Sequence, residues 1–456
     1  MAAILGLLDT ETFAAERFKN PRRAVFYFYP NGAATLTGLL SLMSEESTND
    51  PEFSWYEKRF NEVRTISAAI STTIAFYKTV VGGDAGTWTI ADGDLAIVAA
   101  TTGAAIIYGI KVPANGADKF RPGHVIRFIG ISGTTTENEI IGVVETADQT
   151  NHRISFRAIK ASGADLNYDL AANVGIEILA VGSSFSEGAL DISEENYSLP
   201  LNFGNYTQIF RTPFSMTGTA LKTGAKFDET GVYKDKAKEH MVNHNVELEK
   251  NFLFGEKHIY TGGSLPQRAT GGVLWHLRQW EAGTTYGVSA STVNTDDNKR
   301  IIYLSSGQLS LKDYSGYLER LFRVTNNKTN EKLVLCGSGF LNVLNLMYEG
   351  RAQLQTNMNM GDTYGMDVVK HRTPFGTVYY KTHPLFSLNP TMRYNALFVD
   401  VQNLKYRYLD GRDSELLKNR QANDADYRKD EWLGECGLED RFPESGMYLQ
   451  NVLNAY

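Results

Sequence analysis

At 456 residues the chain is too long for one compact core, and this length predicts two to four domains. Hydrophobic residues make up 42% and charged residues 21%, which is the usage of globular proteins and excludes a fibrous or disordered chain. The formal net charge of −7 argues against a dominant nucleic-acid-binding role, because that role needs a concentrated basic face.

Cysteine usage and hydropathy predict a soluble, unsecreted protein. The two cysteines, Cys336 and Cys436, cannot form a disulfide framework or a four-cysteine zinc site, so a reducing intracellular environment is expected. No apolar run reaches the roughly 18 residues that a transmembrane helix needs. The first residues, MAAILGLLDTETF, lack a basic region and reach Asp9 after a very short apolar run, which makes a poor secretory signal.

The first 190 residues change character twice. Residues 1–50 mix short apolar pieces with polar breaks and predict an arm, with one brief helical candidate at LTGLLSLMSEE. The next stretch, PEFSWYEKRFNEV, interleaves aromatic and charged residues, which suits an extended segment. Residues 80–190 contain short alternating runs such as TWTI, HVIRFIG and RISFRAI between turn-formers, and this pattern predicts a small all-β domain. Pro122-Gly123 is a candidate tight turn.

The pattern then moves from extended to helical. NYTQIFRTPFSMTGTALKTG (205–224) alternates and predicts another extended piece. Directly after it, apolar residues recur at helical spacing, and the sequence predicts one long amphipathic helix over about 229–254. The apolar line of this helix is Ala237, Met241, Leu248 and Phe252.

The last third of the chain alternates helices and strands. Ser310 and Asp313 form a capping-box pattern, which opens a second helix. The buried stripe of that helix is Leu311, Tyr314, Leu318 and Leu321. KLVLCGSG predicts a buried strand, and GFLNVLNLMYEG predicts a helix that ends at Gly350. MDVVKH, GTVYYKTH, ALFVDV and LKYRYLDG are strand candidates, and the tail ends in a further strand-like run.

The stretch EHMVNHNVELEK raises the question of a metal site. His240 and His244 lie four residues apart with Glu247 three further on, a spacing that a zinc protease uses on a helix. Such a protease has a glutamate between its histidines as general base, and Met241 stands there instead. His240, His244, Glu247 and Asn251 form a row at the border of the apolar stripe, which favours packing or hydrogen bonding over metal binding.

Other motifs also fail the tests of catalytic chemistry. Five residues lie between Gly218 and Gly224 in GTALKTGAK, which excludes a phosphate loop. In CGSGF, Cys336 replaces the first glycine of a nucleophile elbow, so it is predicted to be a buried small hydrophobe, and Cys436 a free thiol. NTDDNKR predicts a solvated turn, and SELLKNRQANDADYRKDEW a mixed-charge surface. We expect no catalytic residues, no metal and no cofactor.

The order of these parts resembles the major capsid protein of tailed bacteriophages, which has the HK-ninety-seven-type fold. PEFSWYEKRF, NYTQIFRTPFSMTGTALKTG, KDKAKEHMVNHNVELEKNFLFGEK and RATGGVLWHL carry the resemblance. It implies an α+β fold built from an N-terminal arm, an extended loop, a peripheral domain with a long spine helix, and an axial domain. The resemblance covers the whole chain except the β-rich region, which would be an insertion in the extended loop.

The resemblance assigns each part of the chain to a region. The regions are an N-terminal arm (1–50), an outgoing extended-loop segment (51–79), a β-rich insertion domain (80–190), a returning extended-loop segment (191–227), a peripheral domain with the spine helix (228–330), an axial domain (331–403) and strands that return to the peripheral domain (404–456).

The resemblance implies a structural subunit rather than an enzyme. Such a subunit self-assembles through pentamers and hexamers into an icosahedral shell around double-stranded DNA, in the cytoplasm of the bacterial host, and becomes part of the virion. Scaffolding, portal and decoration proteins and weak non-specific DNA contact are implied, with no membrane partner. Long arms and loops suit this role, because neighbouring copies can order them. We expect assembly contacts at Phe53, Trp55, Arg59, Gln208, Arg211 and Thr217.

Two other functions are compatible with the sequence. The β-rich region would suit a phage tail or fibre protein. The histidine row is the single feature that supports a metal-dependent enzyme, which would use His240 and His244.

Overall fold

The computed structural model describes most of the chain outside its first 44 residues. The described ranges are 45–58, 64–66, 74–77, 87–90, 97–102, 105–112, 116–129, 141–150, 152–160, 177–187, 200–222, 232–263, 265–282, 299–324, 330–349 and 369–455. The chain divides into two compact units, which we call unit 1 (Met1–Glu57 with Leu201–Tyr456) and unit 2 (Lys58–Pro200). Together they contain helices and strands, so the expected α+β class is confirmed.

The first sheet of unit 1 is organised around one 14-residue strand, β24 (Tyr427–Asp440). β24 pairs antiparallel with β13 on one edge and with β22 and β23 on the other, and β1 adds to β22 in parallel. The other strands of this sheet are β1 (Glu45–Thr48), β13 (Gln208–Thr217), β22 (Leu404–Leu409) and β23 (Glu415–Leu417).

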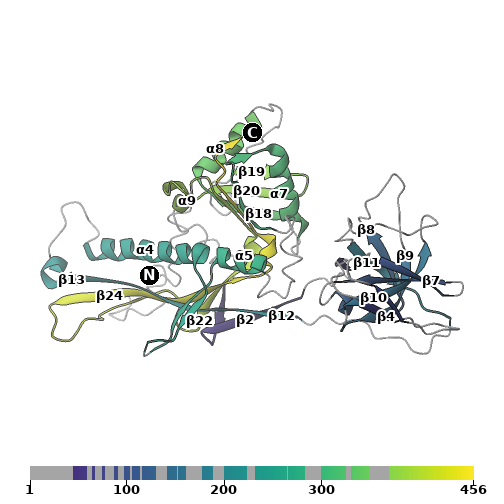
Figure 1. The fold of residues 1–456 in the computed structure, drawn as a ribbon. Coiled ribbons are helices and arrows are strands. Elements are labelled where there is room, and N and C mark those ends of the chain that lie inside the picture. Colours follow the sequence, from purple (N-terminus) through teal and green to yellow (C-terminus); the bar gives the residue numbers. More distant parts are fainter. Residues whose placement is uncertain are drawn as a thin grey trace, which may run out of the picture. The chain divides into compact units, whose positions relative to one another are not determined.

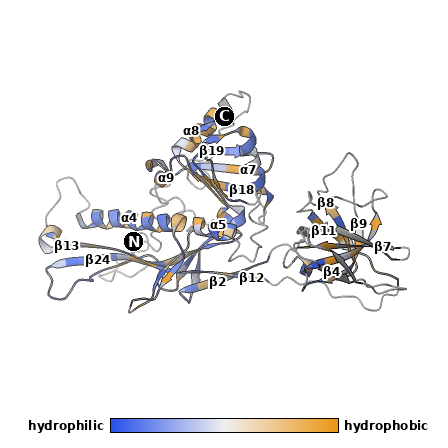
Figure 2. Ribbon diagram, viewed as in Figure 1, coloured by the Kyte–Doolittle hydropathy of each residue, from blue (hydrophilic) through white to orange (hydrophobic). Residues whose placement is uncertain are grey.

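Helix α4 (Val232–Phe254) runs along one face of this sheet (Figure 1). In β13, Phe210, Phe214 and Met216 are buried while the residues between them are partly or fully exposed, so alternate side chains reach toward the helix. α4 is mostly hydrophilic with separate hydrophobic positions (Figure 2). Met241 and Phe252 are among its buried residues, so the predicted long helix is confirmed, with a described start at Val232. Its buried face is less apolar than predicted, because it also contains His244, Asn245 and Glu249.

A two-stranded ribbon of β2 (Glu52–Glu57) and β12 (Leu201–Tyr206) precedes β13. Alternate residues of β2 are buried, which confirms the extended conformation predicted there. The buried side chains form a small aromatic cluster within unit 1 together with helix α5 (Val273–Ala282), which the sequence reading did not predict. The members of the cluster are Phe53, Trp55, Phe203 and Trp280.

The second sheet of unit 1 has six strands and its own core with helices α7 (Leu311–Arg323) and α8 (Ser338–Glu349). Its strands, in spatial order, are β16 (Ile301–Tyr303), β25 (Met447–Gln450), β21 (Ala396–Val399), β18 (Glu331–Cys336), β20 (Thr377–Thr382) and β19 (Val369–Arg372). β16 and β25 lie outside 331–403, because each strand completes the sheet by pairing across a long stretch of sequence. The sheet therefore draws on more of the chain than the axial region assigned from sequence.

Short elements complete unit 1. They are α3 (Gly218–Lys222), β14 (His258–Tyr260), β15 (Gln267–Ala269), β17 (Gln308–Leu309), α9 (Pro384–Leu388), η4 (Val401–Asn403), η5 (Pro443–Ser445) and β26 (Asn454–Ala455). None of the helices in the described ranges is long and apolar enough to cross a membrane.

Local sequence signals account for several of these boundaries. The Ser310 hydroxyl accepts a hydrogen bond from the Asp313 backbone N–H at 3.1 Å, so the predicted capping box opens α7. Gly337 of CGSGF lies so close to Arg393 that an added Cβ would be 2.1 Å from its carbonyl oxygen. Gly337, which joins β18 to α8, is thus required by the close approach of the Arg393 backbone.

Two local predictions were wrong. Glu45 and Glu46, placed at the end of a helical candidate, belong to strand β1 because they pair with β22; the residues before them lie outside the described part. Residues 218–222 form helix α3 rather than continuing an extended segment, since the Thr217 hydroxyl accepts the Ala220 backbone N–H at the first turn.

Unit 2 contains a seven-stranded antiparallel sheet and a separate two-stranded sheet. Its strands are β3 (Arg64–Ile66), β4 (Ile74–Tyr77), β5 (Thr87–Ile90), β6 (Ile97–Thr102), β7 (Ala105–Lys111), β8 (His124–Ile129), β9 (Ile141–Asp148), β10 (Arg153–Lys160) and β11 (Glu177–Ser183), with one turn of 3₁₀ helix, η1 (Ala117–Lys119). Phe128, Ile154 and Phe156 are among its core residues. Pro122-Gly123 forms the predicted turn before β8, with Gly123 at a φ of 88°.

Candidate functional site

The histidine row of α4 packs against β13 of the same sheet. The His240 ring stacks on Phe214 at 5.1 Å between centroids and 11° between planes. His244 is fully buried, and its Nδ1 lies 3.0 Å from the Thr212 hydroxyl. The predicted packing of these two histidines is confirmed.

Burial determines the chemistry of His244. It lowers the pKa of the imidazole to about 4, so the ring is neutral near pH 7. Gly434 of β24 lies next to the ring, because a Cβ there would be in van der Waals contact with His244 Nε2, at 3.5 Å. A neutral imidazole with one hydrogen-bonded nitrogen is a packing residue in this setting.

The other two residues of the row differ: Glu247 faces solvent and Asn251 contacts β13. Glu247 is exposed, and the Asn251 side chain donates to Gln208 Oε1 at 3.0 Å. Within the described ranges, the structure contains no cluster of three or more His, Cys, Asp or Glu side chains suited to a metal ion. The row therefore connects the long helix to its own sheet.

The opposite face of the sheet carries buried carboxylates covered by arginines. Glu431, Glu435 and Glu439 follow one another at every fourth residue of β24, and all three are buried. The ion pairs are Arg211–Glu431, Arg420–Glu431, Arg412–Glu435, Arg407–Glu439 and Arg441–Glu439. Side chains alternate between the two faces of a strand, so the glutamates at odd positions point away from α4, whereas Trp432 and Cys436 at even positions point toward it.

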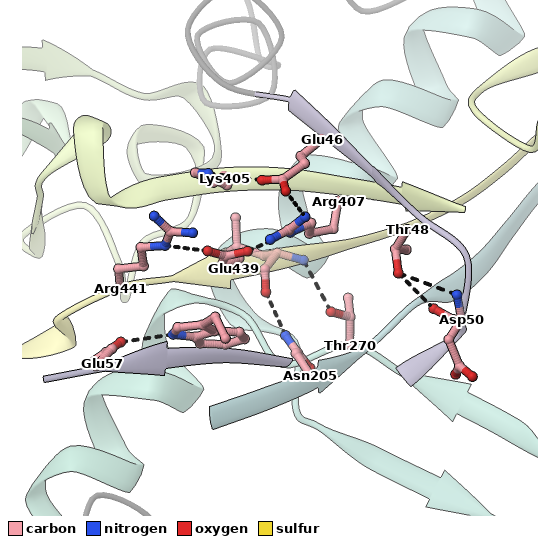
Figure 3. Close-up of polar contacts among 12 residues, drawn as sticks. Glu46, Thr48, Asp50, Glu57, Asn205, Thr270, Lys405, Arg407, Glu439 and Arg441 are labelled. Atoms are coloured by element: carbon pink, nitrogen blue, oxygen red, sulfur yellow. Dashed lines mark hydrogen bonds and ion pairs between the residues drawn. The ribbon is translucent and has the colours of Figure 1, made fainter. Parts of the chain in front are cut away.

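Strand β1 joins this polar face through Glu46. One carboxylate oxygen accepts from Lys405 at 2.9 Å and the other pairs with Arg407 at 2.8 Å. Arg407 in turn contacts Glu439, so the charges form a continuous chain from β1 across β22 to β24 (Figure 3). The hydrogen bond from Lys405 is the main cause of a lowered pKa for Glu46, so the carboxylate is ionised at neutral pH.

Asn205 anchors the β2–β12 ribbon at its base. The buried side chain donates to the carbonyl oxygens of Gly271 and Leu438, at 2.9 and 2.8 Å, and its oxygen accepts from Gly271 N–H at 2.9 Å. Lys257 adds a second link, because its Nζ donates to the Gly204 carbonyl at 2.6 Å. The ribbon is thereby attached by polar contacts to Gly271, just before α5, and to β24, and by the aromatic cluster to α5 itself.

The same ribbon buries a carboxylate at the end of β2. Glu57 Oε1 accepts from Trp55 Nε1 at 2.9 Å (Figure 3) and from the Phe442 backbone N–H at 3.1 Å. Glu57 is also the cross-strand partner of Leu201, so the two strands remain paired up to the point where unit 2 begins.

The six residues expected at assembly contacts lie in different environments. Phe53 and Trp55 are 5% and 4% exposed and pack within unit 1. Gln208 accepts from Asn251 and from the Thr270 backbone N–H within the chain. Arg211 and Thr217 are exposed on β13, and Arg59 lies outside the described residues.

The sequence did not predict two buried polar pairs that the structure contains. Lys332 Nζ lies 2.9 Å from Asp400 Oδ2, and His383 Nε2 lies 2.7 Å from Glu249 Oε1, with all four side chains at most 3% exposed. The partners are 68 and 134 positions apart, so no local spacing signals them. Cys336 and Cys436 are both buried and form no disulfide within the described residues, and burial raises the pKa of the Cys336 thiol.

Comparison with known families matches residues 30–452 to the model of the SU10 major capsid protein. The chain belongs to this family. The match includes β1, the β2–β12 ribbon, unit 2, the long helix and both sheets of unit 1.

One curated relative and several solved capsids are similar to the chain. The major capsid protein of Pseudomonas phage PaMx41 is 23% identical over 248 residues, which cover 54% of this chain and 55% of that protein. The chain thus matches about half the length of this relative. Among solved structures, the capsid of a native GTA particle has 11% identity and a TM-score of 0.39 over 60% of this chain and 82% of that one. The cyanophage A-1(L) capsid has 12% identity and a TM-score of 0.37 over 60% and 85%.

Proposed function

We propose that this chain is the major capsid protein of a tailed bacteriophage, a component of the virion that assembles into an icosahedral shell around double-stranded DNA. The observation that carries the proposal is the family match over residues 30–452. The subunits associate as pentamers and hexamers in the cytoplasm of the bacterial host, with scaffolding, portal and decoration proteins as further partners. The role is structural, and catalysis is not part of it.

The surface of unit 1 supports a role in association. Large apolar side chains are exposed on several separate elements, including Tyr56 at 70% on β2, Ile209 at 52% on β13 and Tyr303 at 64% on β16. Contacts with several neighbours would cover such scattered positions, as a closed shell with heterologous interfaces requires. Arg211 and Thr217 are the expected contact residues that remain exposed in the described chain.

Unit 2 fits the role of an insertion in the extended loop. Glu57 and Leu201, the residues that border it, are partners in the β2–β12 ribbon, so a whole domain enters and leaves unit 1 at one place. A domain inserted at adjacent strand ends is free to contact neighbouring subunits or a decoration protein without altering the fold of its host.

Sedimentation and electron microscopy of the expressed protein test the proposal. The chain, with its scaffold if one is required, should sediment as capsomers and megadalton particles that appear as closed shells. Tubes or trimeric rods would instead identify a tail or fibre protein. Monomers at every concentration and assembly condition would exclude a shell subunit.

A further inference from the structure

A concave site opens on the face of the first sheet opposite α4. Its lining comes from β13, from β24 and from the segment between β23 and β24. The lining residues are Arg211, Asn419, Arg420, Gln421, Lys429 and Glu431. Three cationic side chains and one carboxylate give this site a net charge of +2.

Glu431 holds two of the cations in place from below. Its side chain is 1% exposed, and it accepts from Arg211 at 2.6 Å through one oxygen and from Arg420 Nε at 3.2 Å through the other. Burial alone would raise the pKa of Glu431, but the hydrogen bonds from the two arginines outweigh it and the pKa is lowered. An ionised carboxylate therefore fixes two guanidinium groups that would otherwise repel each other.

Several donors in the site have no acceptor among the described residues. Arg420 uses its Nε on Glu431, and neither of its terminal nitrogens has a partner in the part of the chain that the structure describes. The same holds for Lys429 Nζ. Arg211 and Arg420 are 57% and 50% exposed, so these donors are accessible from solvent. Fixed guanidinium donors beside an ammonium group, around a concavity, are suited to an oxyanion.

We propose that this site binds a carboxylate side chain of a second copy of the chain. The inference rests on the proposed function, which places many copies side by side. Charge complementarity supports the choice of partner: the whole chain carries −7 and the site +2, so the remainder of each copy carries −9. A neighbouring copy therefore contains more carboxylate than cationic side chains outside this site.

The surroundings of the site favour a protein partner over nucleic acid. Ile209 and Pro213 flank Arg211 on the exposed face of β13, and Tyr427 at the start of β24 is 40% exposed. Arginine and tyrosine next to apolar residues are typical of protein interfaces. A DNA backbone would need a longer row of unneutralised cations, because its charges recur every few ångströms.

Zero-length carbodiimide cross-linking of assembled particles tests the contact directly, since it joins a lysine amine only to a carboxylate in contact with it. Particles made from a mixture of ¹⁴N and ¹⁵N copies distinguish links between copies from links within one copy. Mass spectrometry should detect Lys429 joined to an Asp or Glu of another copy. Lys429→Arg keeps the charge and should remove this link while particles still form.

Substitution of the arginines measures the strength of the contact. Arg211→Gln with Arg420→Gln should raise the subunit concentration for half-maximal assembly about tenfold, as expected for loss of a central charged contact. Arg278→Gln is the matched control, because Arg278 is also 57% exposed and ion-paired, with Glu256. Thermal unfolding of the subunits verifies that both variants fold.

The outcomes separate this inference from the proposed function. Shells that form equally well from wild type, double variant and control, with Lys429 unlinked between copies, overturn the contact alone. Wild-type chains that remain monomeric overturn both ideas. A double variant that assembles normally but loses binding to a 30-base-pair DNA duplex would assign the site to nucleic acid and also overturn the contact.

Discussion

His244 occupies a place between helix and sheet that suits a neutral ring. The imidazole is fully buried, contacts Thr212 through Nδ1 and lies above Gly434, where the strand has no side chain. Burial removes water from the ring and disfavours its protonated form, which is the reason that its pKa falls.

This burial predicts a pH-dependent loss of stability. Because the pKa of His244 is about 4 in the folded chain and 6.5 in the unfolded chain, protons bind the unfolded chain preferentially below pH 6.5. The free energy of unfolding should fall between pH 6.5 and 4, with His244 contributing at most about 3 kcal/mol. Urea titrations of subunits across this range measure the slope, which His244→Gln should reduce.

An exposed histidine provides the control for this measurement. His258→Gln on β14 should leave the slope unchanged. Some slope will remain in His244→Gln, because burial also lowers the pKa of His276 to about 3. A slope unaltered by His244→Gln would show that the buried ring is not responsible.

Two glycines should respond to alanine in opposite directions. Gly337→Ala would place a methyl group against the Arg393 carbonyl, and we expect a loss of about 1–3 kcal/mol of stability. Gly316→Ala, inside α7 with open space around it, should gain about 1 kcal/mol because alanine favours helix. Chemical denaturation of the two variants and wild type measures both shifts, and two shifts of equal sign would contradict the packing argument.

At the scale of elements, the β2–β12 ribbon is held by a few specific contacts. Asn205→Ala would leave the Gly271 N–H and the Leu438 carbonyl without their buried partner and should cost about 2–3 kcal/mol. Faster amide exchange should be confined to β2, β12 and residues near 271. Asn202→Ala, at an exposed position of β12, is the control and should change neither quantity. Uniform exchange across unit 1 would disprove a local anchoring role.

Sequence periodicity predicted the positions of helices and strands better than the contacts between side chains far apart in the sequence. The α4 helix and strands β2 and β13 follow from helical spacing or alternation, and β18 follows from its apolar run. These signals depend on neighbouring residues. The arginines above β24 could not be assigned, because Arg211 meets Glu431 220 positions away. Arg211 was expected at an assembly contact, but the concave site around it also depends on Arg420 and Lys429. The segment that contains these two residues was predicted only to be a mixed-charge surface.

At the scale of the whole molecule, unit 2 should be removable. Glu57 and Leu201 are directly paired, so a two-residue Asn-Gly turn can replace residues 58–200 and close the ribbon as a hairpin. We expect the shortened chain to fold, with the helix content of unit 1 retained by circular dichroism and a cooperative thermal transition. Insoluble or non-cooperative material would show that unit 2 is integral to the fold. Electron micrographs of the shortened chain would then show whether shells need unit 2.

The pairing of β1 with β22 has a consequence for the timing of synthesis. Glu46 contacts Lys405, which lies 359 positions later in the chain. β13 cannot pair until β24 has been synthesised, and the first residue of β24 is Tyr427. On the ribosome, β1 and β13 emerge long before the strand that completes their sheet, so that sheet cannot close until nearly all of the described chain has been made. A subunit interrupted before Tyr427 would lack the central strand of that sheet, and translation itself would thus delay assembly until the subunit is complete.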